Sequence, residues 1–167
     1  MAEPRRRSVN PKTVCAPIKP YYSNAVRVSP GPLMFIAGQV ALDRQGRLVG
    51  AGDLKAQATQ VLENIKAICA AEGATMADIV EVTNYVTDMR AFHELTELRA
   101  RYFPKDGPAS VIVEVSRLAL PEWMIEISAV VALPAGRASP TRRPAPAATR
   151  PRATKKPAKK KAARRKR

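Results

Sequence analysis

Two closing segments of the chain, residues 107–118 and 123–132, alternate apolar and polar residues with the period of a β-strand. In the first segment, one side carries Val111, Val113, Val115 and Arg117, and the other carries Ser110, Ile112, Glu114 and Ser116. The second segment holds Glu126 in the middle of an apolar strand, where a carboxylate is unusual. We therefore expect Glu126 to pair with another group, to face solvent or to take part in chemistry.

The residues before these segments predict helices that alternate with strands. Residues 53–72 repeat apolar side chains at three-residue and four-residue steps, with Asp53 and Gly73 at the ends, which indicates an amphipathic helix. A second helix is expected at residues 91–102. Strands are expected at residues 12–18, 25–28, 33–37 and 79–87, with the second and third joined as a hairpin by the turn at 29–32.

This order of elements predicts an α+β fold, in which a mixed β-sheet carries two helices on one face. Two helices shield only one face of a sheet, yet the strands carry apolar residues on both faces. We therefore expect the second face to pack against other subunits.

Charge divides the 167 residues into three parts. Residues 1–7 carry three Arg and one Glu, residues 8–133 are close to neutral, and residues 134–167 carry 14 Lys and Arg with no Asp or Glu. The length suits a single domain. We expect a basic disordered leader at 1–7, the folded domain at 8–133 and a disordered Lys, Arg, Pro and Ala-rich tail at 134–167.

Several motifs occur in a fixed order along the folded part. They are Pro-Tyr-Tyr-Ser-Asn-Ala at 20–25, Phe-Ile-Ala-Gly-Gln at 35–39, Gln-Val-Leu-Glu-Asn-Ile-Lys-Ala at 60–67, Val-Thr-Asn-Tyr-Val-Thr-Asp at 82–88, Pro-Ala at 108–109 and Ile-Glu-Ile at 125–127. With these motifs the chain resembles the Rid (reactive intermediate deaminase, YjgF/RidA-like) family over about residues 8–133. The resemblance implies a chorismate-mutase-like fold, a homotrimer, and small-molecule clefts between neighbouring subunits.

The family's chemistry is the hydrolysis of enamines and imines, such as 2-iminoacids, to a carbonyl compound and ammonia, with no cofactor or metal expected. Glu126 matches the family's Glu, whose catalytic role is to orient water, and Tyr22 matches its Tyr. Gly38 falls within the loop that lines the cleft. A structural role for Glu126, in a hydrogen bond or ion pair between subunits, is an equal alternative.

The chain departs from the family where the substrate carboxylate is bound. The active branch has Pro-Ala-Arg-Ser-Cys, whereas here Ser110 and Ile112 stand at the positions of the Arg and the Cys. A neutral hydrogen bond is worth about 1 kcal/mol against roughly 1.5–3 for a charge-assisted one, so iminoacid affinity is expected to fall about tenfold or more. Arg90 is the nearest alternative cation in the family layout, or else a solvated residue at a helix start. Arg117 lies on the opposite face from Ser110.

The tail supports a separate hypothesis, which is sequence-independent binding of DNA or RNA through phosphate contacts. Its alternative is a solubilising extension. The candidate nucleic-acid-binding residues are Lys155, Lys156, Lys159, Lys160, Lys161, Arg164, Arg165, Lys166 and Arg167.

Neither a secretory signal nor a run of about 18 apolar residues is visible, so we expect a cytoplasmic protein, nucleoid-associated if the tail binds DNA. Cys15 and Cys69 lack metal-like spacing and are expected to be free thiols. Three functions remain open: an imine hydrolase with altered substrate choice, a catalytically silent trimer that binds a metabolite, and a nucleic-acid-associated trimer.

Overall fold

The computed structural model describes residues 5–134. Its elements in chain order are β1 (Arg6–Val9), β2 (Ala25–Val28), β3 (Leu33–Gln39), α1 (Leu54–Ala71), η1 (Met76–Asp78), β4 (Ile79–Val86), η2 (Met89–Glu94), α2 (Leu95–Tyr102), β5 (Ala109–Glu114) and β6 (Ile125–Ala132).

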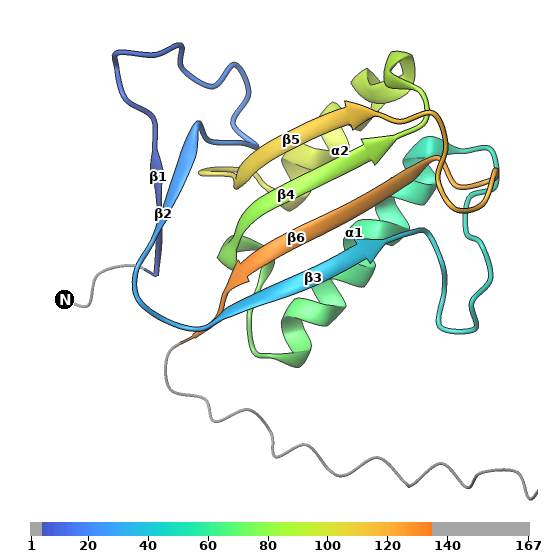
Figure 1. The fold of residues 1–167 in the computed structure, drawn as a ribbon, viewed down its shortest axis with the longest axis horizontal. Helices are drawn as coiled ribbons and strands as arrows, with labels where there is room; N and C mark the ends of the chain where they lie inside the picture. The colour runs from blue at the N-terminus through green and yellow to red at the C-terminus, as the bar shows by residue number, and fades with distance from the viewer. Residues whose placement is uncertain (1–4, 135–167) are drawn as a thin grey trace, which may run out of the picture. The chain divides into compact units, whose positions relative to one another are not determined.

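Four strands form the main sheet in the order β3-β6-β4-β5 (Figure 1). Strands β4 and β5 are parallel and are connected through α2, whereas β6 runs antiparallel to both β3 and β4. Helices α1 and α2 lie together on one face of this sheet (Figure 1). The prediction of an α+β fold with a mixed sheet and two helices is confirmed.

Helix α1 follows directly from its sequence. The Asp53 carboxylate accepts a hydrogen bond from the Ala56 N–H at 2.9 Å, so it caps the helix start as predicted. The apolar stripe packs into the core, and the members of that stripe that are buried are Leu54, Ala58, Val61, Leu62, Ile65 and Cys69. Gly73 has φ of +70°, which ends the helix at low steric cost.

The N-terminal part differs from the prediction in three ways. Residues 12–18 form no strand, and instead β1 pairs antiparallel with β2 in a separate two-stranded sheet. Ala25–Val28 and Leu33–Gln39 are strands, but the expected hairpin between them is wrong because the two belong to different sheets. The expected disordered leader at 1–7 does not hold for Arg6 and Arg7, which lie in β1.

Contacts of arginine side chains explain why this basic segment is ordered. Arg5 forms an ion pair with Asp78, and Arg6 donates to the carbonyl oxygens of Asp106 and Gly107 at 2.6 and 3.0 Å. The positive charges therefore attach β1 to the turns before β4 and β5.

Later boundaries differ less. The expected helix at 91–102 starts as the 3₁₀ turn η2, whose N-cap Asp88 accepts from the Arg90 N–H, and continues as α2. The strand expected over 107–118 is shorter, because β5 ends at Glu114. The expected alternation within β5 is confirmed: Ser110 and Ile112 are half-buried, whereas Val111 and Val113 are exposed.

The face of the sheet opposite the helices is open and carries exposed hydrophobic side chains. Large hydrophobic side chains on β3 and β5 stand out from it, with Phe35 76% exposed and Val111 50% exposed. An exposed aromatic ring of this extent is costly in water, so this face suits contact with another protein surface.

Candidate functional site

The carboxylate of Glu126 lies over Gly38. Glu126 sits on β6 and pairs across the ladder with Tyr85 of β4, while Gly38 lies at an irregularity in the pairing of β3 with β6. A Cβ atom on residue 38 would come within 1.8 Å of Glu126 Oε1, so the carboxylate uses the space that glycine leaves. Within residues 5–134, no hydrogen bond or ion pair holds this carboxylate, and the residue is half-buried.

Ser110 and Ile112 point to the other side of the sheet. Across the ladder, Ser110 of β5 is in register with Val82 of β4, and both belong to the face that packs on the helices. Glu126 is one residue out of phase with the buried Ile125 and Ile127, so it belongs to the open face. Within one chain, the predicted catalytic carboxylate and the predicted anchor position are therefore separated by the sheet.

An arginine that the sequence interpretation overlooked reaches Ser110. Arg99 of α2 is only 6% exposed, and its Nη2 donates to Ser110 Oγ at 2.7 Å. Its guanidinium carbon lies 5.0 Å from the centre of the Tyr21 ring and 5.6 Å from that of Phe92. Burial lowers the pKa of Arg99.

The helix periodicity contains the signal that would have revealed Arg99. Leu95, Arg99 and Phe103 follow one another at four-residue steps, and all three are buried. Because position on the helix decides which side chains face the core, a cationic residue within the apolar stripe is expected to be buried.

Tyr22 lies near edge strand β5, which carries Ser110. Its hydroxyl oxygen accepts a hydrogen bond from the Ile18 N–H at 3.1 Å, and its ring centre lies 6.2 Å from that of Tyr21. The same loop runs beside the start of β5, where Ser23 N–H donates to the Pro108 carbonyl oxygen. Gly107 is required there, because a Cβ on it would lie 2.1 Å from the Tyr21 backbone.

Arg90 is engaged elsewhere. Its guanidinium forks onto the Asp88 carboxylate with N–O distances of 2.9 and 2.7 Å, and its side chain is 91% exposed. This contact lowers the pKa of Asp88 to about 2 and raises that of Arg90. In the described part of the chain no contact brings Arg90 to Ser110, and Arg117 is exposed as well. Of the cations considered, Arg99 is the one that touches Ser110.

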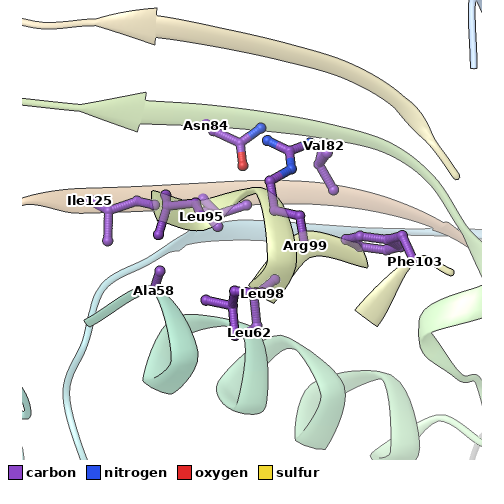
Figure 2. Close-up of a pocket in the computed structure, with 10 residues that line it drawn as sticks. Ala58, Leu62, Val82, Asn84, Leu95, Leu98, Arg99, Phe103 and Ile125 are labelled. Carbon is purple, nitrogen blue, oxygen red and sulfur yellow. The ribbon is translucent and has the colours of Figure 1, made fainter. Parts of the chain in front are cut away.

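Two hollows of the described part of the chain do not bring Glu126 and Ser110 together. The interior cavity drawn in Figure 2 lies between the sheet and the two helices, with Arg99 and Asn84 pointing toward one another above Leu62 and Leu98. Its volume of about 10 Å³ is at the lower limit for one water molecule, so it does not admit a metabolite. A surface hollow of about 370 Å³ includes Gly38 but not Glu126 or Ser110.

Other expectations concern metals, membranes, thiols and the tail. Among residues 5–134, no three His, Cys, Asp or Glu side chains gather as metal ligands would, and none of the helices there is long and apolar enough to cross a bilayer. Cys15 is an exposed thiol and Cys69 a buried one, whose pKa is raised by burial. The nine predicted nucleic-acid-binding residues lie outside the described residues.

Fold and site together define a class of protein: a small α+β domain whose open sheet face carries a carboxylate over a glycine. The family model described as Endoribonuclease L-PSP matches residues 12–133. The chain therefore belongs to the Rid/YjgF/L-PSP (RutC) family.

Individual relatives agree with this assignment. A RutC family protein of Pyrococcus horikoshii is 46% identical over 114 residues, which cover 68% of this chain and 87% of that protein. Among solved structures, a Rid family protein of unknown function from Yersinia pestis, YyfB, is 39% identical with a TM-score of 0.73, covering 77% of this chain and 99% of that one. A YjgF/YER057c/UK114 family member from Mycobacterium tuberculosis is 32% identical with a TM-score of 0.54, covering 77% and 99%.

Proposed function

We propose that this chain is a Rid-type protein that binds small metabolites between subunits and hydrolyses enamine or imine intermediates to a carbonyl compound and ammonia. The observation that carries the proposal is the placement of Glu126: a half-buried carboxylate over Gly38 with no hydrogen-bonding partner in residues 5–134. A structural carboxylate on a strand would be expected to use its lone pairs within the protein. This one is available to a water molecule.

The chemistry needs one group that takes up and returns a proton. The imine reacts in its protonated form, C=NH2⁺. Glu126 accepts a proton from water while the water oxygen forms a bond to the imine carbon and the C=N electron pair moves to nitrogen, which becomes a neutral amine. The resulting carbinolamine receives the proton from Glu126 on nitrogen and loses its hydroxyl proton to solvent. The C–N bond then breaks, leaving a carbonyl compound and ammonia.

The proposed site requires at least two copies of the chain. Glu126 and Ser110 lie on opposite faces of one sheet, so a cleft that contains both must take one from each of two subunits. The exposed Phe35 and Val111 side chains on the face that carries Glu126 support such contact. We propose the homotrimer with inter-subunit clefts that the family resemblance implies, with Tyr22 and Ile112 at the cleft beside Ser110.

The test compares wild type with Glu126→Gln, which keeps the shape of the side chain and removes the base. An amino-acid oxidase generates 2-iminoacids in the cuvette, and semicarbazide traps the imine that the protein does not hydrolyse. We expect Glu126→Gln to lose about 100-fold or more of the hydrolysis rate. Glu114→Gln is the matched control, because that carboxylate caps the Met89 N–H at 2.7 Å and is not placed at the cleft. Equal rates for wild type and Glu126→Gln would refute a catalytic role.

The charge of the tail favours a second candidate function, which is a catalytically silent trimer that associates with nucleic acid. Residues 134–167 carry 14 cationic residues without an acidic one, and three tails on a trimer would multiply weak phosphate contacts. We expect a chain that ends at Leu133 to lose affinity for duplex DNA and RNA together with its steep salt dependence. A full-length chain with the tail cations changed to Gln serves as the control for length. Unchanged affinity of both variants for duplex DNA and RNA would refute this second function.

A further inference from the structure

Arg99 is a buried cation without an anionic partner in residues 5–134. No Asp or Glu of the described chain forms an ion pair with it, although 94% of its surface is removed from solvent. Burying an unpaired charge is unfavourable, and proteins retain such a group only where something compensates it.

The groups that surround Arg99 are neutral. Tyr21 and Phe92 present their rings to the guanidinium, Ser110 accepts its one hydrogen bond, and Nε has no hydrogen-bond partner in the described structure. Ring faces attract a cation but do not neutralise it. None of these neighbours neutralises the Arg99 guanidinium, so its charge can attract an anionic group of a ligand that binds next to Ser110.

Ser110 can donate a hydrogen bond to a ligand while it accepts one from Arg99. Its oxygen accepts the hydrogen bond from Arg99, so its own hydroxyl hydrogen remains available to an acceptor on the ligand. Ser110 is half-buried on edge strand β5, whereas Arg99 lies behind it. A ligand carboxylate that accepts from Ser110 would then sit close to a desolvated cation.

We infer that Arg99, acting through Ser110, is the anchor for the carboxylate of the substrate, so that the chain selects 2-iminoacids over uncharged imines. The inference rests on the proposed function for the reaction, but it concerns binding, which is measured separately. Arg99 of α2 then supplies the cation of the cleft from behind Ser110.

The experiment measures binding to the full chain by titration calorimetry, with 2-oxobutyrate as the anionic probe and 2-butanone as its uncharged match. Arg99→Met removes the charge with a side chain of similar length, and Arg99→Lys keeps the charge. We expect 2-oxobutyrate to bind about 10-fold to 100-fold more weakly to Arg99→Met and to Ser110→Ala than to wild type, and Arg99→Lys to lose much less. Binding of 2-butanone should be the same in all four proteins.

Two outcomes overturn the inference: wild type that does not discriminate between the two probes, or Ser110→Ala that binds 2-oxobutyrate as wild type does. The Ser110→Ala measurement tests the inference even if Arg99→Met fails to fold. Thermal unfolding shows whether each variant is folded. Glu126→Gln separates this inference from the proposed function. It should retain 2-oxobutyrate binding while losing hydrolysis, and if it keeps hydrolysis the proposed chemistry fails while the anchor stands.

Discussion

Replacing Gly38 with Ala should disable Glu126 without unfolding the protein. The added Cβ would lie 1.8 Å from Glu126 Oε1, where ordinary van der Waals contact begins at 3.4 Å, so the oxygen must retreat by about 1.6 Å. A misplacement of about 1 Å at a reacting group costs on the order of 100-fold in rate. Stability should change by less than about 1 kcal/mol, because the end of a half-buried Glu side chain rotates and Gly38 does not have a positive φ.

The assay is imine hydrolysis with semicarbazide competition, performed alongside thermal unfolding. Gly31→Ala is the matched control, because the nearest atom to its new Cβ is the Ser29 carbonyl oxygen at 4.0 Å. If displacement of Glu126 is the cause, Gly38→Ala should add nothing to the loss already produced by Glu126→Gln. A wild-type rate in Gly38→Ala, or full additivity in the double variant, would refute the reasoning.

Two further predictions concern stability and titration. Gly107→Ala should lower the free energy of unfolding by about 3 kcal/mol or more, because its Cβ would lie 2.1 Å from the Tyr21 backbone. Chemical denaturation measures this free energy, and a loss of less than about 0.5 kcal/mol would contradict the predicted clash. Burial and the hydrogen bond to Glu63 raise the pKa of Tyr102 to about 12, so its contribution to stability is present below about pH 10 and is lost as pH rises toward 12. Absorbance titration should show a phenolate transition near pH 12 that Tyr102→Phe removes; its persistence in that variant would assign it to another tyrosine.

Local patterns were enough to predict the two helices and the strands of the main sheet, although not the order of those strands. The stripe and the Asp53 cap define α1, and the alternation of polar and apolar residues assigns the two faces of β5. Each of these signals lies within a few residues of the element that it predicts, and burial in the folded chain agrees with it. The position of Glu126 on the open face also follows from alternation alone.

Pairings between distant segments could not be predicted in the same way. The turn at 29–32 suggested a hairpin, but β2 pairs with β1, whose arginines make it look like a disordered leader. Arg5 and Arg6 of that segment also contact residues about 70 to 100 positions away, and such contacts leave no local signal in the sequence. Arg99 differs, because its burial has a local signal in the apolar stripe of α2. Its contact with Ser110 was not predicted, because that contact joins a helix to a strand.

The opposite placement of Glu126 and Ser110 has a consequence for mixtures of variants. If each cleft takes Glu126 from one subunit and the Arg99–Ser110 pair from its neighbour, then Glu126→Gln and Arg99→Met damage different halves of the cleft. Co-refolding the two impaired proteins should produce mixed oligomers in which a fraction of interfaces unites the two intact halves. At low substrate concentration, hydrolysis by the mixture would then exceed that of either parent alone, as intersubunit complementation.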